Sequence, residues 1–296
     1  MKKVGVFGGC VLAALASGAL VASGAGAATF ETCQFVGKGG NFTESSCATV
    51  ARKKGAADHK GKWELEPVGA CAAMKKGAFS NPACETRRTK RGGSGYGIVP
   101  SVAYTGTLNI TKITLGSVTE GGYIECTGGS SAGTITAGKA ASERLTLTGC
   151  KLGRLACQSV GSSGTPSGAS EEIVTNELAA RLIGHGEQTN GPSHAEPAAG
   201  AAWLEYSSAE HQPYVTEIEC GAAALLLRIS GSLTGASTPT GAMTASVKTF
   251  FEQPVIEEAL VTEVSDGVGF AGETKSNIEA ELVEHLSSPV EIVLSS

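Results

Sequence analysis

The chain has 296 residues, of which 41 are glycine and 5% are aromatic, and its formal net charge is −5. Frequent glycine with few aromatics favours many short strands joined by tight turns and argues against long helices. The acids are almost all glutamate, with aspartate only at Asp58 and Asp266, which argues against aspartate-rich calcium loops and many metal-dependent hydrolase sites.

Residues 1–28 predict a secretory signal peptide. Lys2 and Lys3 give a charged start, a run of small apolar residues follows, and small residues suited to a signal peptidase end the segment at Ala25, Ala27 and Ala28. The alternative is a membrane anchor, but a run so rich in glycine and alanine is weakly hydrophobic for stable spanning. Cys10 would be removed with this leader. No second spanning segment follows, so we expect a mature chain that is soluble or peripherally attached.

Residues 29–91 predict a small basic module with an internal repeat. The segments CQFVGKGGNFTESSC and CAAMKKGAFSNPAC each end in cysteine, with Phe42 and Phe79 five residues before the second cysteine. A glycine and a lysine precede each aromatic. Two such units indicate a duplicated staple rather than a solenoid, and each is too small to bury a core alone. Trp63, between the units, is expected to be a packing anchor rather than a ligand-stacking residue.

Eight cysteines remain after the leader, and an even number in an exported chain predicts a disulfide set. Zinc is disfavoured because there is no C-x-x-C and no Cys–His cluster. Four pairs are expected: Cys33–Cys47, Cys71–Cys84, Cys150–Cys157 and Cys126–Cys220. The first three would close short loops, and the last would tie distant strands.

Charge is divided unevenly along the chain. Residues 29–91 hold twelve Lys and Arg against six acids, whereas residues 92–296 hold nine against 22. The asymmetry indicates mutual docking of the two segments or a basic arm for an anionic partner, with an ordinary solvated surface as the alternative. Anionic envelope polymers or glycans are the expected partners, and nucleic acid is not, because no aromatics are interleaved with the basic charges. Those charges concentrate at Arg52, Lys53, Lys54, Arg87, Arg88, Lys90 and Arg91.

Residues 86–97 read as a linker, and residues 92–296 predict an acidic β-rich body. Short alternating segments with glycine punctuation recur about every ten residues, which is typical of a β-sandwich or barrel. Residues 171–183 favour a strand at their start, and residues 290–294 predict a closing strand. Residues 279–286 fit either a helical segment or a strand pair, and the stretch 251–288 is the least regular part of the chain.

No catalytic or cofactor motif is present, so no catalytic, cofactor-binding or metal-binding residue is expected. His185, His194 and His211 lie among Glu187, Glu196, Glu205 and Glu210, but their spacing matches no closed zinc site. Glu217 with Glu219, and Glu257 with Glu258, could in principle serve glycoside hydrolysis. A polar strand face gives the same pattern routinely.

The mature chain resembles an uncharacterised family of exported actinobacterial proteins with no established activity. The resemblance rests on GGNFTESSC, KKGAFSNPAC, the KWE at residues 62–64, IECTGG, LTLTGC, CQSVG, EIVTNEL and a terminal PVEIVL. It implies export and a β body but no reaction. We therefore expect a secreted or envelope-bound, non-catalytic binding or structural protein. The alternatives are a secreted polymer hydrolase using a Glu/His site and a protein whose cysteine units mediate homotypic assembly.

Overall fold

The fold is mainly β, as the sequence predicts, and the computed structural model is 72% strand. It describes residues 28–51, 61–85, 88, 94–115, 123–160, 171–183, 201–209, 213–221, 225–252, 260–265 and 268–294. The expected leader lies outside these residues, except for Ala28. Within the described residues, no helix is long and apolar enough to cross a membrane. The strands are β1 (Ala28–Gly40), β2 (Gly61–Pro67), β3 (Cys71–Met74), β4 (Gly95–Ile98), β5 (Val102–Leu115), β6 (Tyr123–Glu125), β7 (Gly128–Ala137), β8 (Ala140–Thr148), β9 (Lys151–Leu152), β10 (Leu155–Ser159), β11 (Glu172–Val174), β12 (Leu178–Ile183), β13 (Ala202–Ser208), β14 (Thr216–Cys220), β15 (Leu225–Ser230), β16 (Ser232–Thr238), β17 (Thr244–Glu252), β18 (Leu260–Ser265) and β19 (Phe270–Leu294).

Eight antiparallel strands close into a barrel. The pairings run β5–β7–β8–β12–β13–β16–β17–β19 and return from β19 to β5. Closure leaves no unpaired edge in this ring, and eight strands enclose an interior that side chains can fill. The predicted barrel-like body is therefore confirmed.

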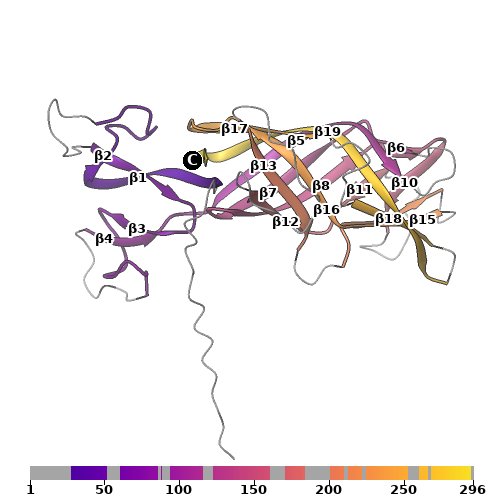
Figure 1. The fold of residues 1–296 in the computed structure, drawn as a ribbon, viewed down its shortest axis with the longest axis horizontal. Coiled ribbons are helices and arrows are strands. Elements are labelled where there is room, and N and C mark those ends of the chain that lie inside the picture. The colour runs from indigo at the N-terminus through magenta and orange to yellow at the C-terminus, as the bar shows by residue number, and fades with distance from the viewer. Residues whose placement is uncertain are drawn as a thin grey trace, which may run out of the picture.

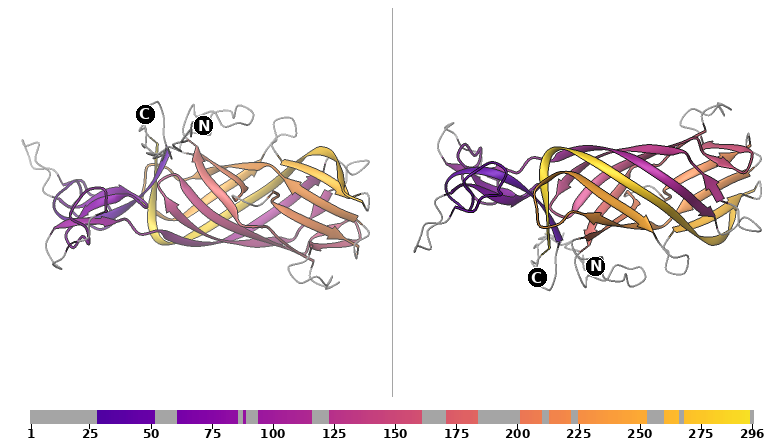
Figure 2. Two further views of the ribbon diagram at one scale, coloured as in Figure 1. Left: turned by 90° about the horizontal axis from the view of Figure 1, so that it is seen from below. Right: turned by 90° about the horizontal axis from the view of Figure 1, so that it is seen from above.

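The two longest strands, β5 and β19, extend beyond the end of this barrel. A second series of pairings leaves β5 through β6, β9, β10, β14, β15 and β18 and reaches β19 again. The body is consequently elongated, as Figures 1 and 2 show, with β1–β4 at one end and β6, β10, β15 and β18 toward the other.

Alternation along each strand separates an apolar inside from a polar outside. On β8, Ala141, Leu145 and Leu147 are buried, whereas Arg144 and Thr148 are exposed. This period of two is the geometric property of a pleated strand with one buried face. The largest fully buried apolar side chains are Leu108, Ile124, Ile173, Leu182, Ile218, Leu227, Leu282 and Ile292.

The N-terminal module is duplicated in space as it is in sequence. In the first unit, β1 pairs with β2 and places Cys33 opposite Leu65 and Phe35 opposite Trp63. In the second, β3 pairs with β4 and places Cys71 opposite Ile98. Phe42 and Phe79 each exchange backbone hydrogen bonds with the strand that follows them in the chain, at Trp63 and Tyr96. The rings of Phe35 and Trp63 meet edge to face at 5.0 Å, so Trp63 packs within its unit. Because β4 completes the second unit, the stretch expected to be a linker contains a strand.

The eight cysteines from Cys33 to Cys220 are all paired, but two of the four expected pairings are wrong. Cys33–Cys47 and Cys71–Cys84 form as expected, whereas the chain forms Cys126–Cys150 and Cys157–Cys220. The reason is strand register. The four body cysteines form a row across neighbouring strands, in the order Cys126, Cys150, Cys157 and Cys220. A bond between the middle two would leave the outer two about 14 Å apart, three strand spacings, which no disulfide can bridge.

The C-terminal region is one long strand rather than the irregular stretch that the sequence indicates. Residues 270–294 form β19, so residues 279–286 are strand and the expected closing strand at 290–294 is its end. Its inward positions are Ile278, Ala280, Leu282 and Glu284. The glutamate among them disguises the alternation, because a period-two pattern is recognised by its apolar members.

Candidate functional site

The histidine-rich loop region cannot be assembled into a site from the described residues. His185, His194 and His211 lie outside them, as do Glu187, Glu196 and Glu210. Glu205 is on β13, opposite Arg181 and Thr234, and is half-buried. Among the residues that the structure describes, no three His, Cys, Asp or Glu side chains gather as a metal site.

Glu217 and Glu219 alternate with the buried Ile218 on β14, so they share a strand face as the sequence predicts. Each is held by a different neighbour. Glu217 accepts two hydrogen bonds from Arg228, at 2.9 and 2.7 Å, and Glu219 accepts one from Gln158. These bonds fix the two carboxylates to opposite neighbouring strands, β15 and β10. The second predicted pair, Glu257 and Glu258, lies outside the described residues.

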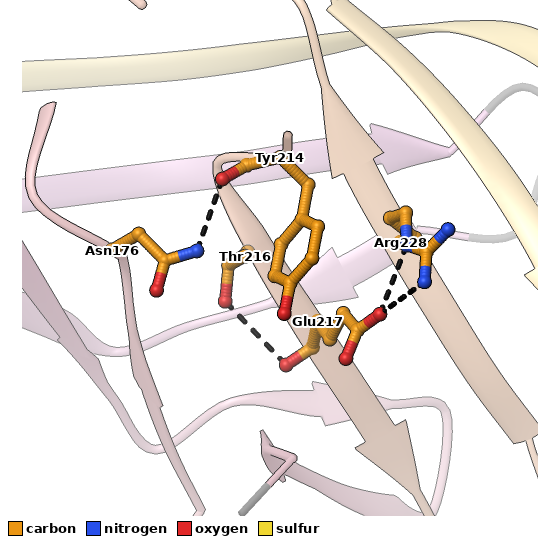
Figure 3. Close-up of polar contacts among 5 residues, drawn as sticks. All are labelled: Asn176, Tyr214, Thr216, Glu217 and Arg228. Carbon is orange, nitrogen blue, oxygen red and sulfur yellow. Dashed lines mark hydrogen bonds and ion pairs between the residues drawn. The ribbon is translucent and has the colours of Figure 1, made fainter. Parts of the chain in front are cut away.

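Arg228 is the centre of a polar and aromatic cluster on the barrel wall (Figure 3). Its guanidinium lies 3.9 Å from the ring centroid of Phe270 and 5.1 Å from that of Tyr214, while it bonds Glu217. Asn176 donates to the Tyr214 carbonyl at 3.0 Å and so fixes the segment before β14. A guanidinium flanked by two rings and a carboxylate is a structural clamp, because each recognition surface of the arginine is already used.

Four lysines gather at the end of the module that lies away from the barrel, and we call them the basic tip: Lys38, Lys62, Lys75 and Lys76. Strand direction places them there. β1 pairs with β19 from Ala28 to Glu31 and then runs on to Gly40, which faces Gly61 at the start of β2. All four lysines are exposed. Lys38 and Lys75 occupy equivalent positions in the two units, because each stands four residues before the phenylalanine of its unit, Phe42 or Phe79.

Further basic residues adjoin the basic tip in the sequence. Residues 52–60 run between Ala51 and Gly61 and contain Arg52, Lys53, Lys54 and Lys60. They lie outside the described residues, but both of their neighbours lie at the tip, since Ala51 donates to the Asn41 carbonyl. Residues 89–93 likewise lead into Ser94, next to β4.

The base of the module has the opposite charge. Glu31 faces Glu291 across β1 and β19, and Glu64 and Glu66 follow on β2. Partial burial, with repulsion between neighbouring carboxylates, raises the pKa of Glu31 and of Glu66, and burial raises that of Glu291. Glu31, Glu66 and Glu291 therefore lie where the module meets the barrel, whereas the lysines of the basic tip lie at its free end.

Inside the barrel lies a polar layer that the sequence did not reveal, which we call the acidic layer: Ser131, Glu143, Tyr206 and Glu284. They come from β7, β8, β13 and β19 and are between 2% and 5% exposed. Strand register aligns them. Glu284 faces Gly106, which faces Ser131, and Glu143 faces Gly133, which faces Tyr104 on β5.

Glycine makes room for this layer. A Cβ at Gly133 would lie 2.3 Å from Cζ of Tyr104, and one at Gly106 would lie 2.4 Å from Oγ of Ser131. Neither position could hold alanine without moving these groups. The ring of Tyr104 thus lies over Gly133 on the neighbouring strand and reaches toward Glu143. Aromatic side chains commonly cover a cross-strand glycine in this way.

Burial sets the ionisation of the two glutamates. Desolvation raises the pKa of Glu143 to about 7, although the hydroxyls of Ser131, Tyr206 and Tyr104 face its carboxylate and oppose the rise. Desolvation and the charge of Glu143 raise the pKa of Glu284 well above its usual value. None of these contacts has the geometry of a hydrogen bond, and both oxygens of Glu143 and one of Glu284 have no partner.

Small cavities flank the acidic layer on both sides. One of about 20 Å³ is lined by Tyr104, Glu284 and apolar residues of β1 and β19. The other, of about 60 Å³, is lined by Tyr206, Thr175, Thr216 and aliphatic side chains. Such volumes admit a few water molecules and are smaller than the cavity of about 150 Å³ that accepts benzene.

One signal in the sequence could have found the acidic layer. Glu143 stands in the apolar phase of ASERLTLT, and Glu284 stands in the apolar phase of IEAELVEHL. A charge at an inward position of an alternating strand is rare unless it is paired or functional.

In the comparisons with known proteins, no family model matches the chain, no curated protein matches it, and no solved structure matches it. The resemblance to exported actinobacterial proteins therefore stays a prediction from the motifs.

Proposed function

We propose that this is an exported, non-catalytic binding protein that holds anionic envelope polymers or glycans at the basic tip of its module. The observation that carries the proposal is the grouping of Lys38, Lys62, Lys75 and Lys76 at the end of the molecule that points away from the barrel. The four disulfides are consistent with an oxidising environment, and the proposed location is the medium or the outer face of the envelope.

The arrangement of charge favours an anionic partner over mutual docking of module and body. Glu31, Glu66 and Glu291 lie at the base of the module, and Glu64, closer to the tip, accepts its hydrogen bonds from Asn41. Among the described residues no acid forms an ion pair with a lysine of the tip, so these lysines are left for another molecule. Exposed ammonium groups attract polyanions over about 8–10 Å at moderate ionic strength, without the exact geometry that a catalytic site needs.

Duplication supports a repeating ligand. Lys38 and Lys75 hold equivalent places in two disulfide-closed units, and Lys75 lies against Phe35 and Gly37 of the first unit. Two equivalent cations on one rigid support fit a polymer whose negative charge repeats along its length. The second contact then costs less entropy than the first, as in any bivalent interaction.

The hydrolase alternative has no specific observation in its favour. Glu217 and Glu219 are bonded to Arg228 and Gln158, and the histidines proposed for acid–base work lie outside the described residues.

The test is retention of the exported full chain on immobilised poly(glycerol phosphate) and on an anionic polysaccharide, measured over a range of salt. The double variant Lys38→Glu/Lys75→Glu should weaken binding by about tenfold or more, since it reverses two charges of the tip. Arg144→Glu is the matched control, because Arg144 is exposed on the barrel wall. Retention that is insensitive to salt, or that falls equally in both variants, would rule out the basic tip as the binding surface.

A further inference from the structure

The acidic layer contains more unpaired polar atoms than a barrel interior can hold without cost. Among the described residues, these are Oγ of Ser131, both carboxylate oxygens of Glu143, Oη of Tyr206 and Oε1 of Glu284. Each buried polar atom without a partner costs about 1–3 kcal/mol. Five of them in one layer, drawn from four strands, indicate a ligand that all five oxygens contact.

The charge of this ligand follows from what surrounds the two glutamates. No Lys, Arg or His is among the buried residues of the described chain. An ionised carboxylate in such surroundings costs several kcal/mol unless an opposite charge compensates it. Two buried carboxylates close enough for the charge of one to act on the other, with no buried basic side chain among the described residues, require a cation or bound protons.

The donor atoms define which cation fits. Carboxylate and hydroxyl oxygens are hard ligands, and the layer offers neither imidazole nor thiolate, so zinc is a poor match. Magnesium demands a regular octahedron, whereas calcium accepts six to eight oxygens in irregular arrangements and takes water among them.

We propose that the acidic layer is a binding site for a calcium-like divalent cation, held between Glu143 and Glu284 and completed by the hydroxyls of Ser131 and Tyr206. The two carboxylates match the charge of a divalent ion. This differs from the aspartate-rich loops that the composition argues against, because each ligand comes from a separate strand of a closed barrel. The site is independent of the basic tip, which lies outside the barrel.

Terbium is a suitable probe, because it replaces calcium and emits when an excited tyrosine lies close to it. With the exported full chain at about pH 8, above the usual range of carboxyl titration, tyrosine excitation should give terbium emission that excess calcium displaces. Calcium should also raise the melting temperature, and a chelator should reverse that rise.

Variants locate the ion. Glu284→Gln should weaken terbium and calcium binding by about tenfold or more, because one of two anionic ligands is lost. Glu219→Gln is the matched control, since Glu219 is another buried glutamate but bonds Gln158. Ser131→Ala covers the case in which the charge variant fails to fold. It leaves both carboxylates in place and removes only one small hydroxyl, so the protein should still fold, yet binding of the ion should weaken several-fold.

Two results would overturn the proposal. The first is a wild-type chain with no tyrosine-sensitised emission and the same melting temperature in calcium chloride as in sodium chloride of equal ionic strength. The second is emission that survives unchanged in Glu284→Gln and Ser131→Ala, which would place the ion elsewhere. If protons alone compensate the carboxylates, the first result is the one observed.

Discussion

Replacing Glu143 by glutamine should make the barrel less sensitive to alkaline conditions. Glutamine keeps the shape of the side chain and removes the ionisable group. The folded protein holds the Glu143 carboxyl at a pKa of about 7, against a reference value of 4.5. Each unit of difference corresponds to about 1.4 kcal/mol, so ionised Glu143 lowers the free energy of unfolding by about 3 kcal/mol.

The direction of the effect follows from proton linkage. A raised carboxyl pKa means that the folded state binds the proton more tightly than the unfolded state does. Below about pH 4.5 both states are protonated and there is no penalty, whereas above about pH 7 both are ionised and the folded state carries the full penalty. Wild-type stability should therefore fall as the pH rises through this window. In Glu143→Gln, the part of this decrease in stability that comes from ionisation of residue 143 should be absent.

The assay is urea unfolding from about pH 4 to pH 8.5, followed by tryptophan fluorescence in the presence of a chelator. The stability of Glu143→Gln relative to wild type should increase by about 3 kcal/mol across the window. Glu31, Glu66 and Glu291 also have raised pKa values, but they are present in both proteins and cancel in the difference. Loss of the Glu143 charge lowers the pKa of Glu284, which adds to the difference in the same direction. A difference that is constant with pH, or that decreases as the pH rises, would refute the assignment of Glu143 as a desolvated inward carboxyl.

Three further predictions test the fold. Gly133→Ala should lower the free energy of unfolding by about 1–3 kcal/mol through overpacking, whereas Gly128→Ala should change it little, because the added Cβ would lie 3.5 Å from the Leu108 carbonyl oxygen; urea titration compares them. Cys126→Ser frees Cys150 beside Cys157, so peptide mapping should find some Cys150–Cys157 exchange product; a homogeneous Cys157–Cys220 bond would contradict the four-cysteine row. Arg228→Ala should cost about 1–2 kcal/mol in the same titration through loss of its ring and carboxylate contacts, and an unchanged midpoint would show that the clamp contributes nothing.

The fold class was predictable because it depends on local patterns. Glycine punctuation and alternating burial indicate strands wherever the inward residues are apolar, as on β5, β8 and β13. The Cys33–Cys47 and Cys71–Cys84 pairs were predictable for a similar reason, since each closes a short loop of the repeat. Neither inference requires knowledge of which strands are neighbours.

Register was not predictable from the same patterns. The Cys157–Cys220 bond depends on β10 lying beside β14, which joins segments 63 residues apart. Likewise, the positions of Glu143 on β8 and Glu284 on β19 relative to each other depend on the register of three successive strand pairings, β8 with β7, β7 with β5, and β5 with β19. A single sequence reports the phase of each strand but not the offset between strands, and a shift of one residue would turn every inward side chain outward.

The glycines beside the acidic layer argue that the layer is a selected feature rather than a packing accident. An interior glycine weakens a strand, because it adds backbone entropy to the unfolded chain and offers no side chain to the core. Gly106 and Gly133 both accept this cost at inward positions next to Ser131 and Tyr104. An apolar layer would have stabilised the barrel on both counts, by filling the glycine positions and by replacing the two carboxylates. A sequence that gives up both contributions at the same level of the barrel keeps a polar layer there, and two carboxylates buried in that layer call for a cation or bound protons to balance them.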